Sequence, residues 1–184
     1  MQEKRSNMEI KLEITRSSIL DCQVEAIVNA ANEDLMRGGG VCGVIHKAAG
    51  VQLDEELFAF GGCKTGEAVV TKGYKTGFKH IIHTVAPRWY QNPPDKEVLL
   101  FNCYINSLKL ADELGIVSIA FPALGMGIFQ VPLGIGSKTA LMAVNQYQKV
   151  NKNIRKVVFS LPDDIIYQAF DRMLDEDKEY IRFN

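Results

Sequence analysis

Residues 29–46 read NAANEDLMRGGGVCGVIH, where a glycine triplet follows a strand-like apolar run and precedes apolar residues at helical spacing. A second glycine-rich stretch, residues 123–129 (ALGMGIF), also lies between a strand-like run and an expected helix. Such loops offer unobstructed backbone N–H groups and the positive end of a helix dipole to an anion. Two of them facing one cleft would hold a diphosphate. An isolated glycine triplet can also serve only to make a tight turn.

Strand and helix patterns alternate along most of the chain. Strand-like runs cover residues 8–15, 25–28, 65–71, 80–85, 117–121 and 155–161. Helical patterns cover residues 41–49, 95–114, 132–150 and 163–175. This alternation predicts an α/β protein, a three-layer α/β/α domain with a mixed, largely parallel central sheet. Ligands bind such folds at the carboxyl ends of the strands, where both glycine loops lie.

Length and composition indicate one globular domain. The chain has 184 residues, of which 47% are hydrophobic, enough for a sizeable core. We expect the domain to span residues 8–177, with short terminal extensions at 1–7 and 178–184. The formal net charge of −1 lacks the broad basic field of a nucleic-acid-binding protein, so such a partner is not expected, although a local basic patch stays open.

The four cysteines, Cys22, Cys42, Cys63 and Cys103, are widely scattered. Their spacing fits neither a zinc site nor a disulfide framework, so we expect reduced thiols and no metal. The first eight residues lack the apolar core of a signal peptide, and no apolar run is long enough to cross a bilayer. These features favour a cytoplasmic protein without a membrane partner, and we expect a monomer.

Four motifs in a fixed order give the glycine loops a more specific meaning. Together with residues 63–68 (CKTGEA) and 80–85 (HIIHTV), the two loops make a pattern that resembles the macrodomain family, whose members bind ADP-ribose. The resemblance extends over about residues 8–174, nearly the whole chain. It implies the macrodomain fold and a cleft for ADP-ribose or an ADP-ribosyl group, with no cofactor.

The resemblance also implies roles for individual residues. Asn32 would hydrogen-bond the distal ribose, Asn29 would brace the loop, and Phe129 would pack on the same ribose or within the core. Ser18 stands where many macrodomains have an aspartate that accepts from the adenine amino group, and Leu161 stands where an aromatic side chain commonly covers the base. The implied ligand-binding residues are Ser18, Ile19, Ala30, Asn32, Gly38, Gly39, Gly40, Val41, Cys42, Gly43, Gly125, Met126, Gly127, Ile128, Phe129 and Leu161.

The motifs are closest to the MacroD-like branch, which removes ADP-ribose from acidic side chains or deacetylates O-acetyl-ADP-ribose. That branch often has an aspartate where this chain has Cys42. Cys42 and His46, one helical turn apart, could form a base or a nucleophile, or Cys42 could merely line the cleft. Alternatively, the phosphate of the substrate activates a water, and the enzyme only positions the sugar. The candidate catalytic residues are Asn32, Gly40 and Cys42.

Three functions therefore remain open. We expect ADP-ribose binding with hydrolysis of ADP-ribosyl esters, because an isolated domain has no partner module to tether. A non-catalytic ADP-ribose reader is the close alternative, and an RNA- or poly(A)-binding macrodomain is a more distant one. His80 and His83 are expected to be structural. A glutamate at Gly40 is expected to abolish binding with little effect on stability.

Overall fold

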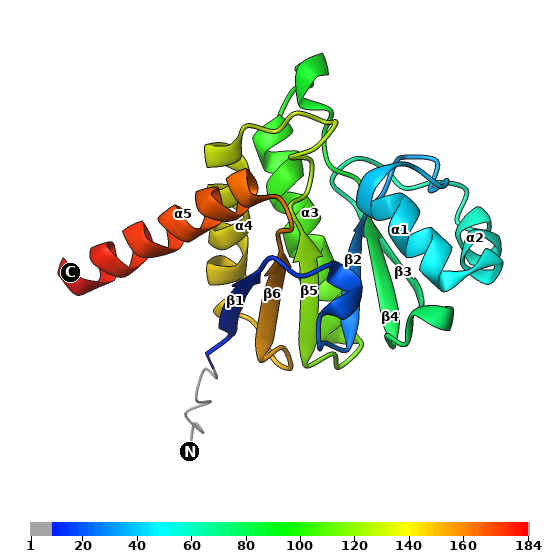
Figure 1. The fold of residues 1–184 in the computed structure, drawn as a ribbon, viewed down its shortest axis with the longest axis horizontal. Coiled ribbons are helices and arrows are strands. Elements are labelled where there is room, and N and C mark those ends of the chain that lie inside the picture. Colours follow the sequence, from blue (N-terminus) through cyan, green and yellow to red (C-terminus); the bar gives the residue numbers. More distant parts are fainter. Residues whose placement is uncertain (1–8, 184) are drawn as a thin grey trace.

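Six strands form one sheet in the order β1-β6-β5-β2-β4-β3 (Figure 1). The computed structural model describes residues 9–183, and their side chains as far as residue 176. The strands are β1 (Lys11–Thr15), β2 (Ala26–Ala30), β3 (Ala68–Lys72), β4 (His80–Thr84), β5 (Ser118–Pro122) and β6 (Lys156–Ser160). The helices are α1 (Gly40–Ala49), α2 (Val51–Phe58), α3 (Lys96–Glu113), α4 (Leu133–Gln148) and α5 (Asp164–Phe183), with short 3-10 turns η1 (Ile19–Asp21), η2 (Tyr74–Thr76) and η3 (Trp89–Gln91).

The sheet is mixed but mostly parallel. The pairs β1–β6, β6–β5, β5–β2 and β2–β4 are parallel, and β3 runs antiparallel to β4 at the edge. Parallel neighbours need long crossover connections, which the helices supply, whereas β3 and β4 are joined by the short segment that contains η2. The predicted fold class is confirmed.

Helices cover both faces of the sheet, and the strands are apolar on both. On β2, Ala26 and Val28 belong to the core under α3, α4 and α5, whereas Ile27 belongs to the core under α1 and α2. The same division holds in β4, where Ile82 lies on the first face and Ile81 on the second. Side chains of successive strand residues point to opposite faces, so continuous apolar runs are what a sheet buried on both sides requires.

Two helical segments differ from the prediction. Gly50 ends α1, as expected, but a second helix of eight residues, α2, begins at the next residue. Helix α5 runs to Phe183 and does not end near residue 175, so the expected extension after residue 177 is helical as far as 183. Glutamate and lysine are good helix formers, so the charged end of this segment is compatible with a longer helix. The expected extension at 1–7, like residue 184, lies outside the described residues.

The four cysteines are free thiols, and all four are buried. Among the described residues, no helix is both long and apolar enough to span a bilayer. The same part of the chain contains no group of three or more His, Cys, Asp or Glu side chains arranged to hold a metal ion.

Candidate functional site

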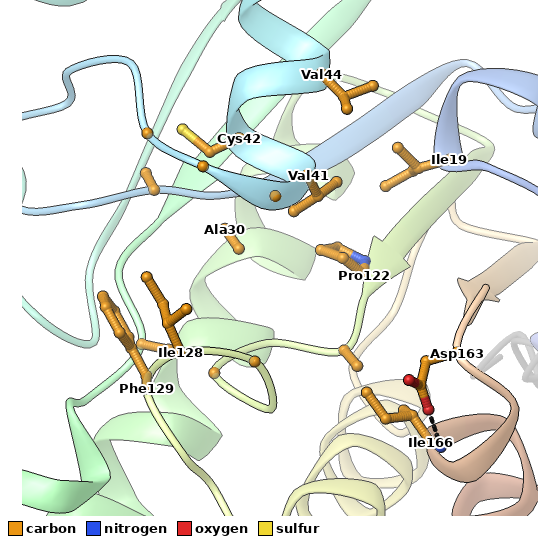
Figure 2. A pocket seen from close by; sticks show the side chains of 18 of the residues that line it. Ile19, Ala30, Val41, Cys42, Val44, Pro122, Ile128, Phe129, Asp163 and Ile166 are labelled. Carbon is orange, nitrogen blue, oxygen red and sulfur yellow. Dashed lines mark hydrogen bonds between the residues drawn. The ribbon is translucent and has the colours of Figure 1, made fainter.

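A cavity of about 830 Å³ opens where the carboxyl ends of β2, β5 and β6 meet (Figure 2). Its walls come from the first glycine loop, the second glycine loop, the start of α5 and the segment that follows β4. All but two of the residues implied by the resemblance line it, namely Ser18, Ile19, Ala30, Asn32, Gly38, Gly39, Gly40, Val41, Cys42, Gly125, Gly127, Ile128, Phe129 and Leu161. The parallel topology therefore brings both loops to one cavity.

The two exceptions are Gly43 and Met126, which do not line the cavity. Gly43 lies in the first turn of α1 against the carbonyl of Gly38, where an added Cβ would come within 2.6 Å of the oxygen. Met126 is 8% exposed, and its side chain packs on Gly136 of α4. Gly43 therefore supports the first loop, and Met126 the second, on the side that faces away from the cavity.

Asn32 lies at the cavity, with its amide engaged in the loop. Its Nδ2 donates to the carbonyl of Met36 at 2.7 Å, and its Oδ1 accepts from the backbone N–H of Met36 at 3.0 Å. The side chain therefore fixes the turn that leads to the glycines. Its expected contact with a ribose stays a prediction.

The glycines of the first loop leave open space in front of the backbone. A Cβ added at Gly39 or at Gly40 would meet no atom within 4 Å. Gly39 has an extended conformation, with φ −85°, whereas Gly40 has φ +56° and begins α1. A side chain at Gly40 therefore carries a backbone strain of about 1 kcal/mol, which the sequence did not reveal. The expectation that Gly40→Glu leaves stability nearly intact conflicts with this φ angle.

The second loop is hydrogen-bonded to the segment that follows β4, residues 87–94, which has prolines at both ends. The backbone N–H of Trp89 donates to the carbonyl of Phe129 at 2.8 Å. The guanidinium of Arg88 lies 5.3 Å from the centre of the half-buried Phe129 ring, and Arg88 and Tyr90 both line the cavity. Sequence reasoning could not place this segment, because only the main-chain contact with the second loop brings it to the site.

The opposite end of the cavity is formed by η1 and the start of α5. Ser18 accepts the backbone N–H of Leu20 at 3.4 Å and so caps η1. Leu161 is only 1% exposed, whereas the half-buried Ile166, which the sequence did not single out, also lines the cavity. Ile166 is therefore better exposed than Leu161 to cover an apolar ring.

Asp163 stands beside Ile166 and is the carboxylate at this end (Figure 2). Its Oδ1 accepts the backbone N–H of Ile166 at 3.0 Å and caps α5. Within the described part of the chain, Oδ2 has no hydrogen-bond partner. In the sequence, Asp163 was recognisable only as part of an acidic helix start. The helix dipole explains that pattern equally well, so it did not point to a binding residue.

Cys42 belongs to a buried polar network behind the first loop. Cys42 is 4% exposed, and its Sγ accepts from Nδ2 of Asn29 and donates to the carbonyl of Met36, each at 3.8 Å. The Nδ1 atom of His46 lies 2.7 Å from Oδ1 of Asp54, whose Oδ2 is 2.6 Å from Nη2 of Arg37. An imidazole and a carboxylate are thus paired, and the imidazole belongs to the residue one helical turn after Cys42.

The network shifts three pKa values toward the charged forms. Burial raises the pKa of Cys42, but the influence of the nearby His46 outweighs burial, and the net pKa is lowered. Burial likewise opposes the charge on His46, but contacts with Cys42 and Asp54 raise its pKa overall. The Arg37 guanidinium is the main cause of the lowered pKa of Asp54. Each shift favours the charged form of its group.

Asn29 and His83 form the inner end of the same network. The Nδ2 atom of Asn29 lies 3.1 Å from Nδ1 of His83, and Oγ1 of Thr71 lies 3.0 Å from Nε2 of His83. Burial lowers the pKa of His83 to about 3, so this ring is neutral at ordinary pH. Asn29 thus braces the loop and His83 is structural, as expected. His80 contacts the carbonyl of Thr71 from the half-buried edge of β4.

Comparison with known proteins gives the same fold. The chain is 34% identical to a variant of the Oceanobacillus iheyensis macrodomain solved with ADPR, with a TM-score of 0.86, covering 91% of this chain and 94% of that one. It is 32% identical to the Trypanosoma brucei macrodomain in complex with ADP-ribose, with a TM-score of 0.83, covering 89% of this chain and 68% of that one.

Sequence relatives agree with the solved structures. A macro domain-containing protein of Caldanaerobacter subterraneus is 39% identical, covering 92% of this chain and 98% of its own. The ADP-ribose glycohydrolase MACROD2 of Xenopus laevis is 40% identical over 90% of this chain, which corresponds to 40% of that longer protein. The family model described as Macro domain matches residues 28–140. The fold and these matches together show that the chain belongs to the macro domain family.

Proposed function

We propose that this protein binds ADP-ribose in the cavity and hydrolyses ADP-ribosyl esters, either mono-ADP-ribosylated acidic side chains or O-acetyl-ADP-ribose. The observation that carries the proposal is the convergence of two glycine-rich loops on one cavity. The binding step is supported by the macrodomain relatives solved with ADP-ribose. The hydrolytic step is supported by the relative named as an ADP-ribose glycohydrolase.

The first loop is suited to a diphosphate. Gly39 and Gly40 lie at the start of α1, whose first backbone N–H groups have no partner within the helix. These donors and the helix dipole attract an anion without any lysine. Because nothing stands in front of either glycine, a phosphate can reach the backbone closely.

The remaining contacts follow the two ends of the cavity. A base fits between Ile19 and Ile166, within reach of the free carboxylate oxygen of Asp163. The distal ribose then lies near Phe129, Asn32 and Cys42. Of the candidate catalytic residues, Asn32 and the Gly40 backbone would position the sugar and the diphosphate, so that a water or a nucleophile meets the anomeric carbon in a favourable geometry.

A non-catalytic reader is the second candidate, and the observation that favours it is Cys42 itself. The MacroD-like branch often has an aspartate at this position, and a thiol that served only to line the cavity would supply no base. The two candidates share the binding step and differ only in turnover. The RNA-binding alternative finds little support in a net charge of −1.

Calorimetry with ADP-ribose and a hydrolysis assay on a mono-ADP-ribosylated glutamate peptide test the two steps separately. We expect saturable 1:1 binding and release of free ADP-ribose, both lost in Gly39→Glu. Binding without release at stoichiometric enzyme would establish the reader instead. Tight RNA binding that weakens steeply with salt, in the absence of ADP-ribose binding, would contradict the proposal altogether.

A further inference from the structure

We propose that Arg88 recognises the carboxyl group through which ADP-ribose is esterified to a protein, and that it stabilises this carboxylate as it leaves. The inference rests on the proposed function and deepens it. It assigns a substrate-binding role to a side chain that lies outside both glycine loops. It also makes Arg88 the residue that selects esters of acidic side chains over other ADP-ribosyl linkages.

The charges that line the cavity are few and lie at its two ends. Among the described residues, only Arg88 and Asp163 line it with a charged side chain. Arg88 lies against Phe129, and Figure 2 shows Phe129 across the cavity from Asp163 and Ile166. A ligand whose base lies at Asp163 and whose diphosphate lies at the glycine loops directs its distal ribose toward Phe129. The group attached to that ribose therefore meets the cation.

Contacts with both glycine loops hold the guanidinium of Arg88. Its central carbon lies 5.3 Å from the centre of the Phe129 ring in the second loop, within the range of a cation–π contact. Its Nη2 atom lies 3.7 Å from Oε2 of Glu33, which follows Asn32 in the first loop. The cation is thus placed where the two loops approach the same sugar.

Glu33 is itself fixed by residues 63–68 (CKTGEA), a motif to which no role was assigned from the sequence. Its Oε1 accepts from Oγ1 of Thr65 at 3.0 Å, and its backbone carbonyl accepts from the N–H of Cys63 at 2.8 Å. The motif therefore orients Glu33, and Glu33 in turn orients Arg88. Glu33 and Thr65 are positioning residues in this arrangement.

The donors of Arg88 remain available to a ligand. A guanidinium has five N–H donors, and within the described part of the chain Arg88 makes no hydrogen bond through them, because the contact with Glu33 is too long for one. The side chains of Arg88 and Glu33 are 38% and 54% exposed, so water weakens their attraction. A carboxylate can accept two parallel N–H bonds from the same guanidinium, and is therefore the better partner.

The chemistry of ester cleavage places a negative charge at this end of the cavity. A water oxygen bonds to the anomeric carbon, the C–O bond to the ester breaks, and its electron pair stays on the departing carboxylate. The proton of the water passes to solvent. Because the charge on the carboxylate grows as the bond breaks, a cation beside it stabilises the transition state more than the bound ester.

The same cation discriminates against other linkages. A serine hydroxyl is a neutral attachment group and gains less from Arg88. An arginine side chain that carries ADP-ribose would bring a second positive charge to the same place, and the two would repel each other. The position of Arg88 thus predicts a preference for ADP-ribose on glutamate or aspartate.

Hydrolysis of a mono-ADP-ribosylated glutamate peptide, measured beside calorimetry with ADP-ribose, tests the catalytic role. Arg88→Gln should lower kcat/KM by at least about tenfold while the affinity for ADP-ribose changes less than about twofold, and Arg88→Lys should lose less. Lys64→Gln removes the same charge from an exposed residue that does not line the cavity, and should keep both values. An unchanged kcat/KM in Arg88→Gln, or an equal loss of ADP-ribose affinity, would overturn the inference.

Charge reversal tests the recognition without any turnover. Arg88→Glu should bind a peptide that carries ADP-ribose on arginine at least about fivefold more tightly than the wild type, because attraction replaces repulsion. Thermal unfolding should show that the variant is folded, and its affinity for free ADP-ribose should serve as the reference. Equal affinity of both proteins for this peptide would overturn the recognition of charge by Arg88.

Failure of the proposed function gives different results. A wild type that binds ADP-ribose but releases none from the glutamate peptide would reject hydrolysis and the catalytic role of Arg88, and the charge-reversal experiment would then decide recognition alone. A wild type that binds no ADP-ribose would reject the proposed function as a whole, and the inference with it.

Discussion

The Nδ1 atom of His46 in α1 lies 2.7 Å from Oδ1 of Asp54 in α2, and this contact joins the two helices on either side of Gly50. Arg37 binds the other oxygen of the same carboxylate. One side chain of α2 therefore links the first glycine loop to the helix that follows it. We expect the stability of this loop to depend on pH through Asp54.

Asp54→Asn should lower the free energy of unfolding at pH 7 by about 1 kcal/mol. The pKa of Asp54 is lowered, mainly by Arg37 and further by His46, so its ionised form stabilises the folded state. That contribution is complete above the ordinary value of 3.8 and disappears as pH falls through the lower folded value. Urea unfolding should thus show a difference between variant and wild type at pH 7 that shrinks below pH 3.8. The exposed Asp34→Asn serves as the control, and an equal difference at both pH values would contradict this account.

Asp163→Asn should weaken ADP-ribose binding without unfolding α5. Asparagine can still accept the N–H of Ile166 through Oδ1, but it replaces the free acceptor Oδ2 with a donor, which opposes the amino group of adenine. Inosine diphosphate ribose, which has a carbonyl at that position, should lose less affinity or gain some. Calorimetry with both ligands measures the change.

The matched control for this experiment is the adjacent Asp164→Asn. Asp164 binds Arg16 and Gln168 and does not line the cavity, so its variant should bind both ligands as the wild type does. Equal effects of the two substitutions would show that only the general charge of the helix start matters. An unchanged affinity of Asp163→Asn would place the base elsewhere in the cavity.

Gly39→Glu and Gly40→Glu should both abolish ADP-ribose binding, but only the second should destabilise the protein. Each adds a bulky negative charge in front of the expected phosphate site. Because Gly40 has φ +56° and Gly39 does not, Gly40→Glu should lose about 1 kcal/mol of stability in addition. Thermal unfolding and calorimetry of both variants check this, and normal binding by either would move the diphosphate away from this loop.

Phe129→Ala should weaken ADP-ribose binding by about 1 kcal/mol, roughly fivefold. The ring is half-buried at the cavity, with the Arg88 guanidinium 5.3 Å from its centre, so its loss removes an apolar surface for the ribose. Phe129→Tyr, which keeps the ring, should bind nearly as the wild type does. Equal affinity of Phe129→Ala and wild type would assign the ring to packing alone.

Several features of the site could be predicted because they depend on local sequence. Strand and helix patterns are short-range periodicities, and the order of β2, the first glycines and α1 places the loop at a strand end. Cys42 and His46 are one turn apart on any helix, so their proximity required no structure. Asp54, in contrast, belongs to the helix that the sequence did not reveal, so its contact with His46 could not be predicted.

The sequence by itself determined the alternation of strands and helices, the two backbone loops and the family resemblance, because each is encoded in consecutive residues. Only the tertiary structure decided which distant side chains meet. Arg88 reaches Phe129 through a main-chain bond between two loops, and Asp163 faces the cavity because β6 lies beside β5 in the sheet. Such contacts depend on how the layers pack, and no local pattern records which loops a packed sheet brings together.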